Sequence, residues 1–311
     1  MIRSARERVW KPWWRRVRFR ALKLWLLPLA GLPRRPGLRA FEWAGLLAYL
    51  LLPRPRRRID ANCRLIFPDW PASRRRGFTR RVFRHLGRNG FDFIRLQRYS
   101  HETIRELVAI EGLENLHRAR RPGMGIVCLS AHLGCWELIP YRMRIEGFDV
   151  AVVYRRIRAP DLNAFVAARR RRFGIETLDR DGAVWGIVRC LARGALVGML
   201  IDQRTSVDSV RVPFLGRPAW TPTGPIRLAM RLGAPIVPIV VTMEADGSHR
   251  LQIAPEVELA PVPPGAEPDR VADVVRENTR RCNDALSRII LERKEQWVWF
   301  HRRWHDVCTV S

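Results

Sequence analysis

The chain has 311 residues, of which 47% are hydrophobic, a size that suits one large α/β domain or two smaller ones. Its 57 Lys and Arg against 30 Asp and Glu give a formal net charge of +27, which indicates an anionic partner: nucleic acid, an anionic membrane or a phosphorylated substrate. The six cysteines form no CxxC pair and no framework of short spacings, which argues against a disulfide scaffold and against a zinc site.

Residues 1–32 combine tryptophans and cations in a helical pattern. Apolar residues from Trp10 to Trp25 recur at three- and four-residue steps, with arginines and lysines between them. This pattern is typical of an amphipathic helix in a bilayer interface. A signal peptide or spanning helix and a buried helical hairpin are the alternatives, although Arg34 and Arg35 directly after the apolar run weaken the signal-peptide interpretation. The apolar runs 24–32 and 41–52 are too short to cross a bilayer. We therefore predict membrane-interfacial helices within residues 1–60.

From residue 71 onward, the spacing of apolar residues predicts helices that alternate with buried strands. Helices are expected at 71–98, 160–173, 182–193, 224–232 and 269–292, and strands at 125–130, 150–153, 195–201 and 235–241. The proline-rich residues 260–268 are expected to form a linker. Strands that alternate with helices predict an α/β fold, here a mixed sheet with flanking helices that occupies residues 61–311.

His132 is the leading candidate for a catalytic residue. It directly follows the apolar strand expected at 125–130, and catalytic groups favour the carboxyl ends of strands in α/β sheets. Glu137 lies five residues later and could hold the imidazole in one tautomer if Gly134 allows a bend and Glu137 begins a helix. The spacing alone is weak, since a structural histidine near a helix start would look the same.

Arginines and one aspartate are candidates for substrate binding. Arg155, Arg170, Arg172 and Arg204 could recognise phosphates, because a guanidinium pairs with them bidentately, and each could equally be a solvated surface residue. Asp202, at the end of an expected strand, could orient a bound group or Arg204, or could simply be a turn or N-cap residue.

The H-x4-E unit and the three sequence blocks that follow it resemble the lysophospholipid acyltransferase superfamily. The blocks that carry this resemblance are 132–137, 152–155 (VVYR), 200–205 (LIDQRT) and 233–240 (GAPIVPIV). Further motifs are similar to those of the late, lauroyl/myristoyl-type acyltransferases of lipid A biosynthesis, namely 62–68 (NCRLIFP), 202–203 (DQ), 212–219 (VPFLGRPA), 221–224 (TPTG), 295–297 (EQW) and 299–304 (WFHRRW). The sequence departs from this family at Arg156 and Ala159, where proline and asparagine are usual, and at Lys294, where a proline is usual.

The resemblance implies an O-acyltransferase with a glycerolipid acyltransferase-like fold. His132 would be the general base and Glu137 would stabilise the imidazolium, with Arg155, Arg170, Arg172, Asp202, Gln203 and Arg204 as the expected substrate-binding residues. It implies an acyl carrier protein or coenzyme A thioester as donor and a membrane lipid as acceptor, with no cofactor and no metal. Cys135 has no second base nearby in the sequence, which favours direct transfer over a covalent acyl-enzyme.

Membrane placement follows from the same resemblance. The expected location is the cytoplasmic face of the inner membrane, where the arginines would meet an anionic surface. A basic nucleic-acid-binding protein is an alternative that the charge alone permits, but the sequence contains no helix-turn-helix, RRM, KH or zinc-finger pattern. An inactive membrane-scaffolding relative is the other alternative.

Overall fold

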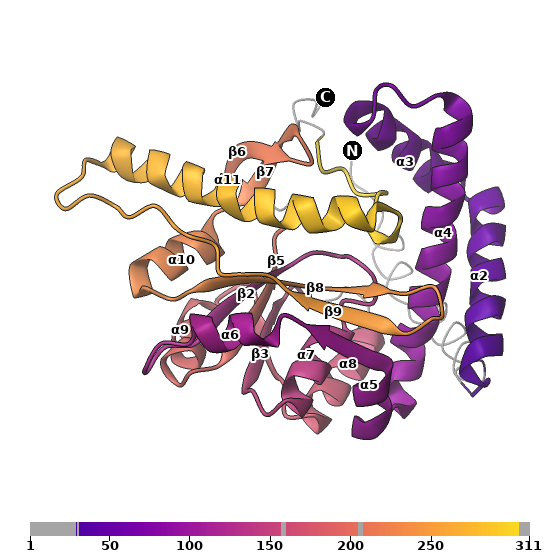
Figure 1. Cartoon of the computed structure of the whole chain (residues 1–311), viewed down its shortest axis with the longest axis horizontal. Coiled ribbons are helices and arrows are strands. Elements are labelled where there is room, and N and C mark those ends of the chain that lie inside the picture. The colour runs from indigo at the N-terminus through magenta and orange to yellow at the C-terminus, as the bar shows by residue number, and fades with distance from the viewer. Residues whose placement is uncertain (1–28, 30, 157–159, 205–207, 305–311) are drawn as a thin grey trace, which may run out of the picture.

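The computed structural model describes residues 29, 31–156, 160–204 and 208–304 (Figure 1). Its helices are α2 (Arg34–Leu51), α3 (Pro53–Ile66), α4 (Ala72–Arg95), η1 (Leu96–Arg98), α5 (His101–Leu107), α6 (Leu113–Ala119), α7 (Leu138–Ile145), α8 (Pro160–Arg172), α9 (Val184–Ala192), α10 (Gly224–Leu232), α11 (Pro268–Glu292) and η2 (Lys294–Gln296). Its strands are β1 (Val108–Glu111), β2 (Ile126–Ser130), β3 (Val150–Tyr154), β4 (Glu176–Asp179), β5 (Leu196–Leu200), β6 (Ser209–Phe214), β7 (Arg217–Pro222), β8 (Ile236–Met243) and β9 (His249–Ile253).

A seven-stranded mixed sheet forms the centre of the fold, in the order β1-β9-β8-β2-β5-β3-β4. The strands β8, β2, β5, β3 and β4 run parallel to one another, whereas β9 pairs antiparallel with β8 and parallel with β1. The β2–β5 register pairs Ser130 with Leu200, so these two strands end side by side. Residues that follow β2 and β5 at equal distances therefore meet at the carboxyl edge of the sheet.

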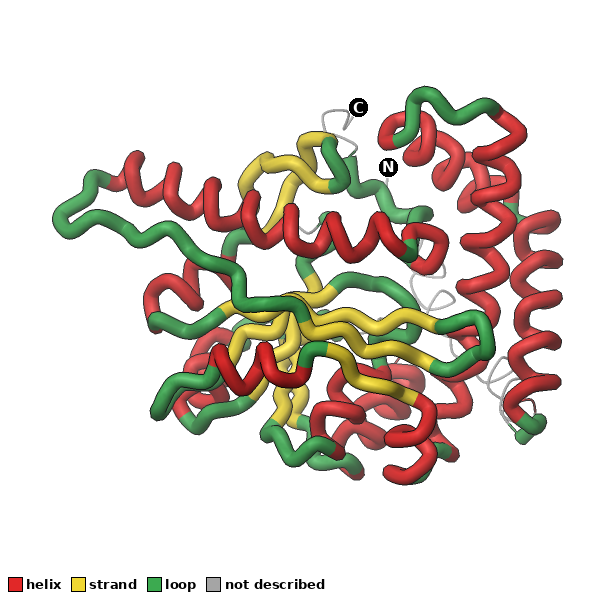
Figure 2. Tube along the Cα trace, in the orientation of Figure 1, coloured by secondary structure: helices red, strands yellow, loops and turns green. Residues whose placement is uncertain are grey.

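Helices cover both faces of this sheet, as Figure 2 shows. In β2, Val127 and Leu129 belong to one core cluster, together with residues of α9, α10 and α11. Ile126 and Cys128 belong to a second cluster on the opposite face, with residues of α5, α6 and α7. This period-two division explains why the central strands read as continuous apolar runs, because both of their faces are buried.

The hairpin β6–β7 stands apart from the main sheet and packs on α11. Its two-residue turn is Leu215–Gly216, and both residues have positive φ, 50° and 78°. Such a turn matches the twist of the flanking strands. The hairpin is held to α11 by Asn283, which donates to the Pro213 carbonyl oxygen and to Thr221 Oγ1, both at 2.9 Å.

The helix α2 packs against α4 at the side of the molecule (Figure 1). Two glycines permit the contact: a Cβ at Gly45 would overlap the Phe83 carbonyl oxygen, and one at Gly87 would overlap the Phe41 carbonyl oxygen. In the described residues no helix is long and apolar enough to cross a bilayer.

A buried charge cluster fastens α2 and α4 to the sheet. Asp92 of α4 is fully buried and accepts hydrogen bonds from His249 Nε2 at 2.8 Å, Tyr99 Oη at 2.6 Å, and Arg34 Nη2 at 2.9 Å. Burial by itself would raise the pKa of Asp92, but His249 and Arg34 more than compensate, and the pKa lies below its ordinary value of 3.8.

The predicted α/β architecture, with a mixed sheet and flanking helices, is confirmed. All four predicted strands are present as β2, β3, β5 and β8, and the five predicted helices correspond to α4 with η1, α8, α9, α10 and α11. The strands β1, β4, β6, β7 and β9 were not predicted. The amphipathic helix expected around Trp10–Trp25 lies outside the described residues, so the proposed N-terminal membrane helices remain a prediction.

Candidate active site

His132 lies in a turn between β2 and α7, at the carboxyl edge of the sheet. The bend depends on Gly134, whose φ is +57° and whose missing Cβ would otherwise overlap the Val241 carbonyl oxygen. The helix α7 then begins at Leu138, with Glu137 as its N-cap residue. The His132 side chain is 24% exposed, so solvent or a ligand can reach a ring whose surroundings are otherwise buried.

Asp202 holds His132 at two points. Its Oδ1 lies 2.8 Å from His132 Nδ1, and its Oδ2 accepts the His132 backbone N–H at 2.8 Å. Asp202 follows β5 by two residues, as His132 follows β2 by two, and the register of these adjacent strands brings the two side chains together. A carboxylate on Nδ1 fixes the tautomer that carries its proton there and leaves Nε2 as the acceptor.

Trp297 completes the surroundings of Asp202. Its indole Nε1 donates to Asp202 Oδ2 at 2.7 Å, and the Trp297 side chain is fully buried. Burial alone would raise the pKa of Asp202, yet the attraction of His132 and the hydrogen bonds from His132 and Trp297 outweigh it and lower this pKa below 3.8. Asp202 is therefore a buried carboxylate that favours its charged form.

Residues 296–298 also form hydrogen bonds with the backbone of the His132 turn. Gly134 N–H donates to the Gln296 carbonyl oxygen at 3.1 Å, and Val298 N–H donates to the His132 carbonyl oxygen at 3.2 Å. The Gln296 side chain binds both the N–H and the carbonyl oxygen of Met243, at 2.8 and 2.7 Å, where β8 ends. Asn62 of α3 in turn holds this segment through the carbonyl oxygens of Trp299, at 2.6 Å, and His301, at 2.9 Å.

Glu137 does not contact His132 as the spacing suggested. Its two carboxylate oxygens form a bidentate pair with Arg170, with both nitrogen–oxygen distances 2.7 Å. Both side chains are buried, and the pair joins the start of α7 to α8. Burial would lower the pKa of Arg170, but the charge of Glu137 overcomes this and raises it, so the guanidinium stays protonated. The position beside His132 Nδ1 that was expected for Glu137 is thus occupied by Asp202.

The remaining predicted binding residues are spread over the carboxyl edge and α8. Arg155 is exposed directly after β3, and Gln203 and Arg204 are half-buried directly after Asp202. Arg172 is exposed in the last turn of α8. Asp202 is fully buried and engaged by protein groups, which places it behind His132 and not on a substrate-facing surface. Arg170 is likewise buried, so it does not occupy the surface position expected of a phosphate-binding residue.

Cys135 is buried in this turn, and burial raises the pKa of its thiol well above the ordinary value of 9.0. A thiol of this kind is a poor nucleophile, because the thiolate is the reactive form. His301 lies near His132 and Asp202, and burial lowers its pKa despite the charge of Asp202. Across the described ranges, no group of three His, Cys, Asp or Glu side chains is arranged to hold a metal ion.

Comparison with known proteins gives this geometry a context. The family described as bacterial lipid A biosynthesis acyltransferase matches residues 16–306. The chain belongs to this acyltransferase family. The family resemblance expected from the motifs is therefore confirmed.

Two similar relatives of the lipid A biosynthesis acyltransferase family come from Escherichia coli K12. The chain is 25% identical to its lipid A biosynthesis lauroyltransferase, over 83% of this chain and 82% of the relative. It is 26% identical to its lipid A biosynthesis palmitoleoyltransferase, over 78% of this chain and 76% of the relative. A phosphatidylinositol mannoside acyltransferase of Mycobacterium tuberculosis H37Rv is 25% identical over 52% of this chain and 53% of the relative. These similarities identify an acyltransferase that acts on a lipid acceptor.

Sequence reasoning missed two parts of the site. It treated Trp297 as a packing residue, and it placed Asp202 among substrate-binding residues. The signal for Asp202 was present, since His132 and Asp202 each follow an apolar strand directly, but the adjacency of β2 and β5 is a property of the sheet and not of either segment.

Proposed function

We propose that this protein transfers a fatty acyl chain from an acyl carrier protein or coenzyme A thioester to a hydroxyl of a membrane glycolipid such as a lipid A precursor, with His132 as general base. The observation that carries this proposal is the bonding of a partly exposed imidazole, at Nδ1, to the buried carboxylate of Asp202. The named activities of the lipid A lauroyltransferase and palmitoleoyltransferase relatives suggest the class of acceptor.

The proposed reaction needs one proton to move twice. Nε2 of His132 takes the proton of the acceptor hydroxyl as its oxygen attacks the thioester carbonyl carbon. The tetrahedral intermediate then collapses, the carbon–sulfur bond breaks, and the departing sulfur takes the proton back from the imidazolium. Asp202 stabilises the imidazolium between these two steps, and general-base help of this kind contributes roughly 10²–10⁴-fold.

Glu137 and Arg170 support the same site from its other side. The buried ion pair fixes the start of α7, and therefore the end of the turn that carries His132. Arg155, Gln203 and Arg204 follow β3 and β5 at the same sheet edge, where a phosphorylated acceptor or donor would have to lie. Arg172 remains a candidate for the same role from the end of α8.

The test is transfer of a radiolabelled acyl chain from acyl carrier protein to a lipid A precursor in detergent. His132→Ala should abolish transfer and keep the wild-type circular dichroism spectrum, although with a lower unfolding midpoint, because buried Asp202 loses one of its partners. Asp202→Asn should lower kcat by roughly 10³–10⁴-fold, since an orienting carboxylate of this kind has an effect of that order. A His132→Ala variant that kept more than a tenth of the wild-type rate would show that another group is the base.

A further inference from the structure

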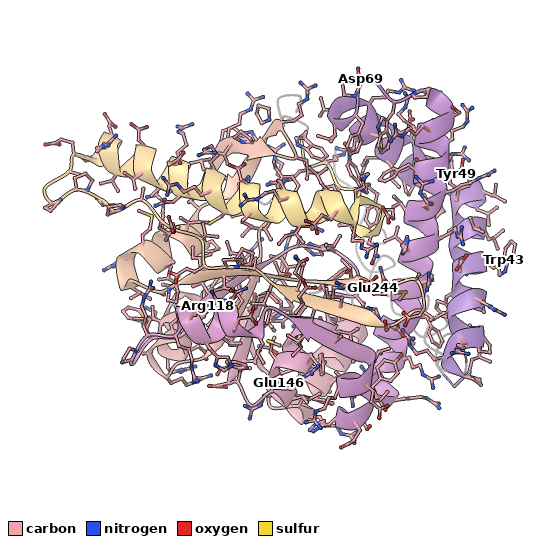
Figure 3. The ribbon with its side chains drawn as sticks, viewed as in Figure 1. Trp43, Tyr49, Asp69, Arg118, Glu146 and Glu244 are labelled. Atoms are coloured by element: carbon pink, nitrogen blue, oxygen red, sulfur yellow. The ribbon has the colours of Figure 1, made fainter. Side chains whose placement is uncertain are left out.

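The outward face of α2 carries an unusual concentration of exposed apolar side chains. Four of them, together with the C-cap residue Leu52, form what we call the apolar stripe, each between 47% and 71% exposed: Trp43, Leu47, Leu50, Leu51 and Leu52. Their spacing places Trp43, Leu47 and Leu50 on one side of the helix, and Figure 3 shows Trp43 pointing away from α4. Exposed apolar patches of this kind mark interaction sites.

The opposite face of α2 is fully used by the fold. Gly37, Leu38, Phe41, Gly45 and Tyr49 are buried against α4 and the sheet end. The Tyr49 ring packs edge-on against Phe83 of α4, with ring centroids 5.7 Å apart. The apolar stripe is therefore surplus to the packing of α2, and its exposure needs another explanation.

Charge at both ends of the apolar stripe identifies the occupant. Arg35 and Arg39 are exposed before it, and Arg54 and Arg57 are exposed after it. Glu42 is the one acid in α2, and it is half-buried and paired with Arg84 of α4. An apolar stripe with a tryptophan, bordered by arginines that form no ion pair within the described residues, matches the boundary between acyl chains and anionic headgroups.

We propose that the apolar stripe of α2 lies in the headgroup–acyl boundary of an anionic bilayer and docks the folded body of the protein on it. A second copy of the chain fits less well, because a two-fold contact between α2 helices would bring arginine-bordered surfaces together without acids between them. The proposal concerns binding alone and does not depend on the acyl acceptor, so it can fail while the proposed reaction stands.

The apolar stripe also has a structural route to the active site. The helix α4, which carries α2, packs on η2 as well. The same η2 supplies the Gln296 carbonyl oxygen that accepts from Gly134 in the His132 turn. Docking through α2 would therefore place the bilayer on a rigid part of the molecule and set the height of His132 above it.

A site-directed fluorescent label tests the location directly. Leu47→Cys would be labelled with the environment-sensitive dye NBD in a chain that also carries Cys308→Ser, because the other five cysteines are buried. Addition of phosphatidylcholine–phosphatidylglycerol vesicles should shift the emission to the blue. The matched control is a label at Trp185→Cys, another exposed apolar position with 83% exposure, whose emission should not shift. Unchanged emission at position 47 while the protein floats with the vesicles would overturn the proposal, as it would mean that this face is covered by something else.

An affinity measurement on the unlabelled full chain complements the label. The triple variant Trp43→Ser/Leu47→Ser/Leu50→Ser should bind the same vesicles about 100-fold more weakly, since each large apolar side chain that leaves the boundary weakens binding by roughly tenfold or less. The control variant Val184→Ser/Trp185→Ser removes a comparable exposed apolar surface from α9 and should bind as wild type does. Circular dichroism of both variants should match wild type. Equal binding by the two variants, or a Leu47→Cys label that responds to protein concentration without vesicles, would refute the bilayer as the occupant.

Discussion

At the scale of single residues, the candidate site contains a hydrogen bond from Trp297 to Asp202 that the sequence motif does not predict. Trp297 was expected only to pack the C-terminal helix against the core, yet its indole N–H donates to the carboxylate that holds His132. The carboxylate has few ways to rotate, because Oδ1 faces the imidazole while Oδ2 accepts from both the His132 backbone and the Trp297 indole. We therefore expect Trp297 to be a positioning residue, two hydrogen bonds removed from the proposed chemistry.

Trp297→Phe should reduce kcat about tenfold or more and leave KM nearly unchanged, because a hydrogen bond to a charged acceptor contributes roughly 1.5–3 kcal/mol. Trp299→Phe is the matched control: this indole is equally buried and donates at 2.6 Å to the Lys294 carbonyl oxygen, away from Asp202. Both variants should lose similar stability in urea. Equal kcat values for the two variants would assign Trp297 a packing role alone.

At the scale of elements, the sequence predicted the strands that are buried on both faces and missed those that are not. The residues of β2 and β8 are all buried, so their sequences are continuous apolar runs. The edge strand β4 has one buried residue among four. The strands β6 and β7 contain prolines and arginines between their apolar residues, so none of these three strands is a continuous apolar run. Propensity cannot identify an edge strand whose position depends on its neighbour.

The active site was predictable in part for the same reason. His132 and the bend at Gly134 follow from local sequence, whereas its partner Asp202 and the pairing of Glu137 with Arg170 depend on which elements are adjacent. The charge pattern was equally ambiguous for Arg170. In the sequence, Arg170 resembled a phosphate-binding residue at the surface. In the fold, Arg170 is the counter-ion of the buried Glu137 carboxylate at the start of α7.

The Asp92 cluster makes an element-level prediction about pH. Asp92→Asn should lower the free energy of unfolding at pH 7 by about 3–5 kcal/mol, because it leaves Arg34 and His249 buried without their anion. The pKa of Asp92 is depressed in the folded chain, so its stabilising contribution is complete above its ordinary pKa of 3.8 and disappears as the pH falls through the lower folded value. The difference between wild type and variant in urea unfolding should therefore shrink on acidification below about pH 4. A difference independent of pH would mean that the carboxylate charge is not what stabilises α2.

At the scale of the whole molecule, the charge of +27 is open to two interpretations, and salt separates them. If the arginines serve an anionic bilayer and phosphorylated substrates, binding to vesicles should increase with anionic lipid and retain a salt-resistant part from buried apolar area. Binding to duplex DNA should be unselective and should weaken steeply with salt, as counterion release requires for any cationic surface. Vesicle flotation and DNA retardation at physiological salt make the comparison. Tight, sequence-selective DNA binding without retention on vesicles would contradict the proposed membrane function.

The bonds between the His132 turn and residues 296–298 also order events during synthesis. Translation delivers His132, Glu137 and Asp202 to the growing chain long before Gln296, Trp297 and Val298 leave the ribosome, and domains acquire structure as they emerge. An unfinished chain would thus contain every proposed reacting group but would lack the contacts from residues 296–298 that hold the His132 turn and Asp202. We therefore expect the site to become competent only after residues 296–298 have been added and have folded onto the His132 turn. Chains truncated before residue 296 should therefore be inactive in acyl transfer.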